Sequence, residues 1–356
     1  MQGRSLAQAK STRLKQVQDV LSIIFPSPAA PSLVRKIACR LLVPLDHFST
    51  HFPIRLDAPA DIYHSTFLPL VNAPPRSVCA ARVLTVYDLI PIILPEFCTY
   101  ENRALIEQVI NSAVYADRVM AISESTKSDL CEHTGIDPDR VAVTPLAASA
   151  QFYPCQSREA HAEVRSKYGI PDGQYALSLC TLEPRKNIEQ VIRSYVDLVR
   201  QQRLDDLSLV LVGTKGWDFD HIFDEIKGAD ALSDKIIITG YLPDEALAPV
   251  YSGATMFLYP SLYEGFGLPV LEAMQCGVPV VTSNVSSLPE VVGNAGIMLD
   301  PRDGAGLSQA MFDIYSDETL RERLALQGVA HANTFSWERC AKSTIAAYET
   351  ALAQAT

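Results

Sequence analysis

Two short segments in the second half of the chain combine residue types that suit the binding of a phosphorylated ligand. The first, Thr181–Asn187 (TLEPRKN), places Arg185 and Lys186 between an apolar run and an amphipathic stretch. A turn from a strand into a helix offers an anion free backbone N–H groups and the positive end of the helix dipole. Two adjacent cations add charge-assisted hydrogen bonds there, so the segment predicts a diphosphate site. A solvated basic pair on the surface fits these residues equally well.

The second segment, Tyr263–Met274 (YEGFGLPVLEAM), places two carboxylates around a turn that contains two glycines. Gly265 and Gly267 lack side chains, which lets backbone N–H groups approach a ligand closely. Glu264 stands in this turn, and Glu272 lies about one turn inside the helix expected after it. One carboxylate is placed to accept hydrogen bonds from sugar hydroxyls and the other from a ribose. The alternative is a tight turn with a helix-capping acid.

The sequence provides few groups that suit a metal. Asp137-Pro138-Asp139 matches a D-x-D metal signature, but its surroundings, GIDPDRV, predict a turn before a strand. His47 and His51 are four residues apart with no supporting cluster of Cys, Asp or Glu, so we expect no zinc site there. The eight cysteines include no C-x-x-C pair, which is typical of reduced thiols in a cytosolic protein. We therefore expect neither a metal nor a cofactor.

Short apolar runs that alternate with helical segments position these residues. The expected strands are Tyr175–Cys180, Leu207–Val212, Lys235–Thr239, Thr255–Tyr259, Val278–Thr282 and Gly296–Leu299. Between the first two, one helical face collects Ile188, Val191, Ile192, Tyr195, Val196 and Val199. Asn187 with Gln190 resembles a relaxed capping box that would start this helix, while Pro269 and Gly277 suit the first turn and the end of a later one. Alternating strands and helices predict a parallel sheet, which binds ligands at the carboxyl ends of its strands.

The first half of the chain repeats this scheme less clearly. The expected strands are Arg82–Tyr87, Arg118–Ile122 and Arg140–Thr144, and the expected helices are Ser5–Ile24, Ser32–Leu42, Asn102–Tyr115 and Ser125–His133. The segment Pro145–Pro154 has two prolines and little periodicity, as interdomain linkers do. We predict an α/β protein with two Rossmann-like domains that face each other across a cleft. Residues 1–154 and 155–356 would form these domains, and the last helix would return to the first one.

Length and composition agree with two domains and exclude several functions. The chain has 356 residues, of which 48% are hydrophobic, and its net charge of −11 disfavours a nucleic-acid partner. No apolar stretch approaches the roughly 20 residues of a membrane span. In the polar N-terminus, Arg4, Lys10, Arg13 and Lys15 fit a solvated helix end better than contact with an anionic membrane. Missing G-x-S-x-G and G-x-G-x-x-G motifs disfavour an acyl-transfer hydrolase and a nicotinamide oxidoreductase.

Taken together, these motifs resemble the retaining glycosyltransferases of the GT-B class. The string EGFGLPVLEAM, followed by GVPVVTS and LPEVVGNAG, is most similar to family 4, which includes bacterial mannosyl- and glucosyltransferases of surface polysaccharide synthesis. TLEPRKN matches the diphosphate-binding turn of that family, and Thr239–Leu247 (TGYLPDEAL) matches the segment before its base pocket. The resemblance runs from roughly Asp61 to Trp337 and is stronger in the second half.

The resemblance implies a role for each matching residue. Arg185 and Lys186 would hold the donor diphosphate, Glu264 would contact the transferred sugar, and Glu272 would bind the ribose hydroxyls. The residues implied to lie along the sugar and phosphates are Gly265, Phe266, Gly267 and Leu268, and those implied near the nucleobase are Tyr241 and Leu242. The family needs no bound metal, because the cationic turn replaces it.

The implied reaction moves a hexose with retention of the anomeric configuration. The acceptor would attack from the face of the leaving group, and a phosphate oxygen would take its proton, while the cationic turn stabilises the departing diphosphate. GDP-mannose is the implied donor, with a UDP-hexose close behind. The implied acceptor is a growing glycan on a lipid carrier, which would place a cytoplasmic protein at the inner membrane surface.

The chain departs from the family pattern in its first half. The strand and glycine-rich loop with which relatives begin are not evident before residue 60. Tyr87 stands before Asp88, where the family often has a histidine that contacts the donor sugar, and His64 is either a substitute or a structural histidine. A non-catalytic relative that binds nucleotide sugars therefore stays an alternative, as does a GT-B phosphorylase or epimerase.

Overall fold

The computed structural model describes residues 60–355 except 71, 72, 74, 75, 78 and 217. The two helices expected before residue 60 and the absent glycine-rich loop fall outside these residues. So do the pair His47 and His51 and the basic N-terminal side chains. Among the helices that are described, none is both long and apolar enough to cross a membrane.

The second half of the chain forms a six-stranded parallel sheet with the order β10-β9-β8-β5-β6-β7. Its strands are β5 (Gln174–Leu179), β6 (Leu207–Val212), β7 (Ile236–Gly240), β8 (Met256–Tyr259), β9 (Val280–Ser283) and β10 (Ile297–Leu299). All six lie where the apolar runs predict them. The chain builds outward from β5 to β7, crosses back to place β8 beside β5, and then builds outward on the other side. The order therefore reverses between β5 and β8.

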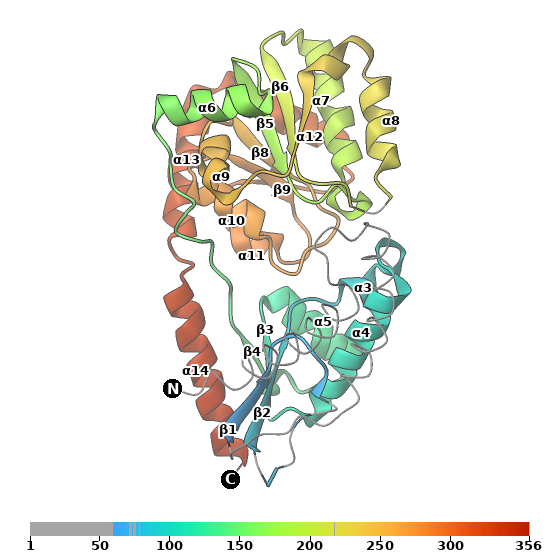
Figure 1. The fold of residues 1–356 in the computed structure, drawn as a ribbon, viewed down its shortest axis with the longest axis vertical. Coiled ribbons are helices and arrows are strands. Elements are labelled where there is room, and N and C mark those ends of the chain that lie inside the picture. The colour runs from blue at the N-terminus through green and yellow to red at the C-terminus, as the bar shows by residue number, and fades with distance from the viewer. Residues whose placement is uncertain (1–59, 71–72, 74–75, 78, 217, 356) are drawn as a thin grey trace, which may run out of the picture. The chain divides into compact units, whose positions relative to one another are not determined.

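Helices connect these strands and cover the sheet (Figure 1). They are α6 (Arg158–Tyr168), α7 (Ile188–Gln202), α8 (Asp220–Gly228), α9 (Asp244–Ser252), α10 (Leu268–Gln275), α11 (Leu288–Val292), α12 (Gly304–Ser316) and α13 (Glu318–Ala332), with a 3-10 helix, η6, at Asp230–Lys235. Helix α7 packs against α12 and α8, and α6 packs against α9. The predicted apolar face of α7 is buried, as its pattern requires.

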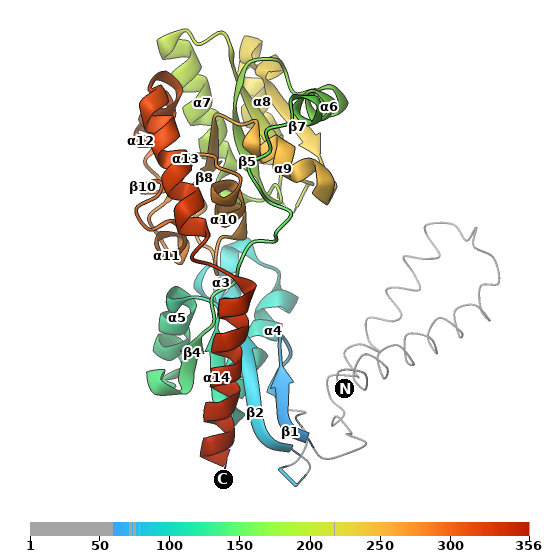
Figure 2. The same cartoon turned by 90° about the vertical axis from the view of Figure 1, so that its left-hand side faces the viewer.

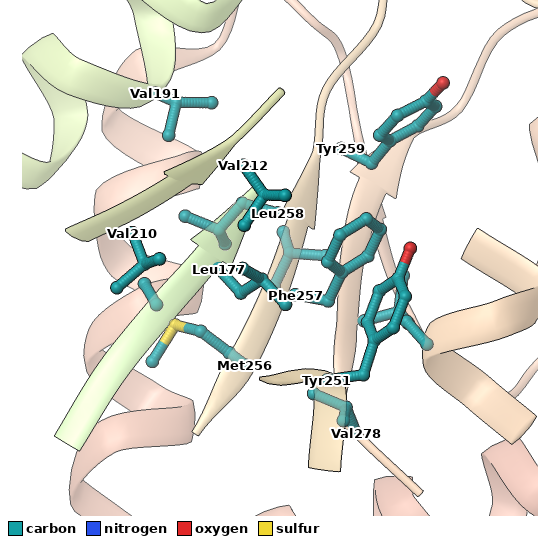
Figure 3. Close-up of a cluster of buried hydrophobic side chains, with 14 of the residues drawn as sticks. Leu177, Val191, Val210, Val212, Tyr251, Met256, Phe257, Leu258, Tyr259 and Val278 are labelled. Atoms are coloured by element: carbon teal, nitrogen blue, oxygen red, sulfur yellow. The ribbon is translucent and has the colours of Figure 1, made fainter. Parts of the chain in front are cut away.

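The core of this half surrounds the central strands (Figure 3). Leu177 and Val210 are fully buried in the sheet. Phe257 on β8 lies between two tyrosines, with its ring centroid 5.3 Å from that of Tyr251 and 5.8 Å from that of Tyr259. This packing fixes β8 and therefore the loop that follows it.

The first half forms a four-stranded parallel sheet with the order β1-β2-β3-β4. Its strands are β1 (Ala60–Ser65), β2 (Cys79–Val86), β3 (Arg118–Ala121) and β4 (Val141–Val143). Its helices are α3 (Ile90–Ile93), α4 (Tyr100–Asn111) and α5 (Glu124–Thr134), with the 3-10 segments η2 (Pro95–Phe97), η3 (Ser112–Tyr115) and η4 (Pro138–Arg140). The sequence interpretation missed β1, because ADIYHS mixes polar and apolar residues and presents no apolar run. Asp137 accepts a hydrogen bond from the N–H of Asp139 at the start of η4, so the D-x-D string forms the predicted turn.

The C-terminal helix α14 (Trp337–Ala355) packs along the first sheet (Figure 2). Ala347 and Ala351 are buried against Ala81, Val83 and Met120 of β2 and β3. His64 of β1 links its Nδ1 to the hydroxyl of Tyr348 at 2.8 Å. Between β4 and α6 the chain has no helix or strand. The expected domain boundary between residues 154 and 155 falls in this segment and stays a prediction.

Candidate functional site

The site lies where the strand order of the second sheet reverses. Thr181–Asn187 follows β5, and the glycine turn follows β8, which pairs with β5. In doubly wound sheets the loops at the carboxyl ends of the two strands that flank such a reversal diverge and leave room for a ligand. The topology thus brings together two segments that are about 80 residues apart in the sequence.

Arg185, Lys186 and Glu264 form a compact, nearly buried charge cluster. Lys186 Nζ lies 2.6 Å from Glu264 Oε1, and Arg185 Nη1 lies 3.0 Å from Glu264 Oε2. The side chains of Arg185, Lys186 and Glu264 are 13%, 11% and 9% exposed, respectively. Arg185 also pairs with Glu183 at 2.7 Å, and Lys186 donates to the hydroxyl of Tyr259 at 2.7 Å. The competing interpretation of Arg185 and Lys186 as a solvated surface pair is therefore wrong.

The cluster holds its groups in their charged forms. Burial alone would raise the pKa of Glu264, but Lys186 and Arg185 outweigh it and leave that pKa below its ordinary value. Burial alone would lower the pKa of Arg185, but Glu264 and Glu183 raise it well above its ordinary value. The two carboxylates, Glu264 and Glu183, thus nearly balance the charges of the two cations.

The turn that carries the cations is fixed by Asn187. Residues Pro184–Lys186 form a 3-10 helix, η5, and Asn187 follows in the left-handed conformation with φ of 59°. Its side-chain amide donates to the carbonyl oxygens of Pro260 at 3.0 Å and Pro301 at 2.7 Å. The predicted capping box is wrong: α7 begins after Asn187 without a side-chain cap, and Gln190 donates to Ser194 instead. Asn187 ties the cationic turn to the loop after β8.

The glycine turn is packed so closely that side chains would not fit. A Cβ atom on Gly265 would lie 2.7 Å from the carbonyl oxygen of Tyr87. Gly267 has φ of 113°, a left-handed conformation that glycine adopts without strain, and α10 begins at the next residue. Ser287 donates to the carbonyl oxygens of Glu264 and Phe266 at 2.9 Å and 2.8 Å. Pro269 lies in the first turn of α10, and Gly277 follows its end with φ of 74°, as expected.

Other predicted site residues differ in how they are placed. Phe266 is buried, its ring packs edge-on against Phe335, and its carbonyl oxygen accepts from Ser287. Leu268 is half-buried at the start of α10. Tyr241 and Leu242 follow β7, which β6 separates from β5 and therefore from the charge cluster. Tyr241 is exposed and Leu242 is buried in the core, and their roles near a base stay predictions.

Glu272 is half-buried in α10, and its Oε2 accepts a hydrogen bond from the hydroxyl of Tyr251 at 3.0 Å. Burial raises the pKa of Glu272 to about 7, against the opposing effect of this hydrogen bond. Its carboxyl group therefore changes charge near neutral pH, and its contact with a ribose stays a prediction.

The first sheet contributes groups that the sequence interpretation did not single out. Ser123, at the start of α5, donates to the carbonyl oxygen of Gly265 at 2.8 Å. Glu290 of α11 accepts hydrogen bonds from the N–H groups of Glu124 and Ser125 at 2.8 Å and 2.7 Å. Burial raises the pKa of Asp88, while the charge of Arg185 lowers it and that of Glu264 raises it. The sequence analysis assigned no role to these residues, because each hydrogen bond joins loops from different sheets.

The arrangement suits an anionic ligand that also carries hydroxyl groups. Cations can bind a diphosphate, and carboxylates can accept hydrogen bonds from hydroxyls. Gly265 and Gly267 are buried, so the close approach that they permit is to Tyr87 and Leu288. Over the described part of the chain, no cluster of three or more His, Cys, Asp or Glu residues could hold a metal ion. The seven cysteines within that part are free.

Comparison with known proteins identifies the family. The family model "Glycosyl transferases group 1" matches residues 161–329. O-antigen chain mannosyltransferase B from Escherichia coli is 36% identical over 289 residues, which cover 81% of this chain and 74% of that protein. Serotype-specific mannosyltransferase WbdA from Escherichia coli is 31% identical over 290 residues, 79% of this chain but only 34% of that longer protein.

The fold is also that of known glycosyltransferase structures. WaaG, a glycosyltransferase involved in lipopolysaccharide biosynthesis, superimposes with a TM-score of 0.62 at 18% identity, over 90% of this chain and 84% of WaaG. Two parallel sheets, a reversal of strand order in the second and a C-terminal helix that packs on the first agree with this likeness. The chain therefore belongs to the glycosyl transferases group 1 family and is a glycosyltransferase with the GT-B fold.

Proposed function

We propose that this glycosyltransferase moves a mannosyl group from GDP-mannose to a glycan acceptor, with retention of the anomeric configuration. The observation that carries the proposal is the buried cluster of Arg185, Lys186 and Glu264 at the strand switch point. The choice of mannose rests on two relatives that are named mannosyltransferases.

The cluster supports departure of a nucleoside diphosphate. As the bond between the anomeric carbon and the phosphate oxygen breaks, negative charge grows on the diphosphate. Arg185 and Lys186, held by their carboxylate partners before the donor arrives, stabilise that charge without reorganising. The two cations make a metal unnecessary for this step, because they supply the positive charge themselves.

The acceptor completes the reaction on the same face of the sugar. Its hydroxyl oxygen forms the new bond to the anomeric carbon, and its proton passes to the departing phosphate oxygen. The sugar carries oxocarbenium character between these events. Glu264 accepts hydrogen bonds from the sugar hydroxyls, and Glu272 accepts them from the ribose once its carboxyl group is ionised.

The proposed acceptor is a lipid-linked glycan in the synthesis of a cell-surface polysaccharide. The support is the printed name of O-antigen chain mannosyltransferase B and the role of WaaG in lipopolysaccharide biosynthesis. Such an acceptor would bring the protein to the cytoplasmic face of the inner membrane.

The test is transfer by the purified protein from a panel of nucleotide sugars to a synthetic lipid-linked mannose oligosaccharide, followed by mass spectrometry. We expect a product from GDP-mannose whose new linkage an α-mannosidase cleaves. Lys186→Met should abolish transfer, while Lys227→Met should not, because the Lys227 side chain on α8 is 77% exposed. A product from another nucleotide sugar alone, or conversion of the donor without acceptor, would contradict the proposal.

A further inference from the structure

Two exposed aromatic rings lie close together at one edge of the first sheet. Phe67 follows β1 and Tyr87 follows β2, so both stand at the carboxyl ends of paired parallel strands. Their ring centroids are 6.4 Å apart with an interplanar angle of 57°. Phe67 is 50% exposed and Tyr87 is 39% exposed, so neither ring is packed into the hydrophobic core.

The backbone beneath both rings is held in place. The loop after β1 is tied by Ser65, whose hydroxyl accepts the N–H of Leu68 at 3.1 Å and donates to the carbonyl oxygen of the same residue. Two residues later, the N–H of Leu70 donates to the buried hydroxyl of Ser112 at 2.9 Å. Anchored loops that hold exposed rings have little entropy to lose when a ligand stacks on them.

Tyr87 also connects this pair to the donor side of the site. Its carbonyl oxygen accepts a hydrogen bond from Thr126 at 3.0 Å and lies against Gly265. Gly265 follows Glu264, so the backbone of Tyr87 borders the loop that carries the proposed sugar contact. Single exposed aromatic residues are common on protein surfaces and require no explanation. Two neighbouring exposed rings on anchored loops, one of which lies against Gly265, do require an explanation.

We propose that Phe67 and Tyr87 form a stacking platform for the terminal sugar of the acceptor. The inference rests on the proposed function and names the part of the site that selects its second substrate. One face of a pyranose presents C–H groups, which pack favourably on the electron-rich faces of aromatic rings. The hydroxyl of Tyr87 donates a hydrogen bond to the sugar. The platform thus orients an acceptor hydroxyl toward the anomeric carbon at Glu264.

A contact between Tyr87 and the donor sugar is the competing assignment, and the two assignments predict different kinetics. If the rings hold the acceptor, Phe67→Ala and Tyr87→Ala raise the KM for the acceptor and leave the KM for the nucleotide sugar unchanged. Aromatic contacts of this kind predict a rise of about 3- to 10-fold for each variant. Tyr87→Phe keeps the ring and should show the smaller effect. Tyr100→Ala is the control, because Tyr100 is 81% exposed on α4.

A binding measurement separates this proposal from the proposed function. Mannobiose is titrated into the protein in the presence of GDP and observed by saturation-transfer difference NMR, which requires no turnover. We expect saturation of the sugar C–H protons in the wild type and in Tyr100→Ala, and its loss in Phe67→Ala and Tyr87→Ala. The thermal midpoints of all variants should match the wild type, since both rings are exposed.

Each outcome decides one of the two proposals. Equal mannobiose binding by all variants, no binding by the wild type, or a rise in the donor KM without a rise in the acceptor KM would overturn the platform. Loss of binding in the two ring variants supports the platform even if the wild type fails to transfer mannose. In that case it is the proposed reaction that fails.

Discussion

Substituting Glu264 with glutamine tests whether the charge cluster is built to receive an anion. The change keeps the size of the side chain and removes the one charge shared by Arg185 and Lys186, which lie 3.0 Å and 2.6 Å from its oxygens. Removing one partner of a buried ion pair costs about 3–5 kcal/mol, because the remaining charge is left uncompensated. At about 2–4 °C per kcal/mol, the thermal midpoint of Glu264→Gln should fall by roughly 10 °C.

A nucleoside diphosphate should recover part of this loss. In the variant Glu183 still pairs with Arg185, so the cluster has one excess positive charge that GDP can neutralise, whereas in the wild type Glu264 already balances it. We therefore expect GDP to bind the variant more tightly and to raise its thermal midpoint by more than that of the wild type. A tenfold gain in affinity corresponds to about 1.4 kcal/mol of additional stabilisation at saturating ligand.

The dependence on pH supplies an internal check. The pKa of Glu264 in the folded protein lies below its ordinary value of 4.5, so its ionised form stabilises the protein above that pH. This contribution is lost as the pH falls through the folded-state pKa. The difference in thermal midpoint between the wild type and Glu264→Gln should then narrow. Differential scanning fluorimetry from pH 3 to pH 8, with and without GDP, measures the fall in thermal midpoint, its recovery by GDP and its dependence on pH.

The matched control for this experiment is Glu107→Gln on α4. Its partner Arg103 is 2.9 Å away, and their side chains are 45% and 47% exposed, so the loss should stay within about 1 kcal/mol. The reasoning is refuted if Glu264→Gln is as stable as the wild type, or if GDP stabilises both proteins equally. Equal stability would mean that Arg185 and Lys186 do not depend on Glu264. Equal stabilisation by GDP would mean that they do not receive the diphosphate.

Two further substitutions test the glycine turn and the ribose contact. Because the pKa of Glu272 is about 7, GDP should bind more tightly as the pH rises from 6 to 8, and calorimetry should show a flat profile for Glu272→Gln. A rising profile in that variant would assign the titration to another group. Gly265→Ala places a methyl group 2.7 Å from the carbonyl oxygen of Tyr87, so it should cost about 1–3 kcal/mol of stability and most of the transfer activity. Gly228→Ala has open space around its new methyl group and serves as the control; equal behaviour of the two would show that the turn tolerates a side chain.

The sequence alone was sufficient to predict the second sheet. Its four central strands, β5, β6, β8 and β9, are buried on both faces, so they read as short apolar runs, and the helix after β5 shows a clear apolar face. The convergence of Arg185, Lys186 and Glu264 was also predictable, because loops at the carboxyl ends of adjacent parallel strands lie close together. Local pattern and general topology were enough for these residues.

The first sheet was harder to predict because its elements depend on distant partners. Strand β1 has no apolar run and is stabilised by pairing with β2 and by the contact of His64 with Tyr348 on α14. The conformation of Asn187 likewise depends on the carbonyl oxygens of Pro260 and Pro301, which lie far away in the sequence. The capping-box interpretation failed because tertiary hydrogen bonds outweighed a local preference.

The sequence therefore determined which residues are charged, and the tertiary structure decided which groups each charged side chain contacts. Periodicity and loop position depend on neighbours in the chain and can be read from it directly. The balance of Arg185 and Lys186 by Glu264, and the placement of Tyr87 against Gly265, arise only when β8 crosses back beside β5 and the two sheets contribute loops to one site. Short-range forces set the elements, whereas the partners of a buried group are set by the packing of segments that are remote in the sequence.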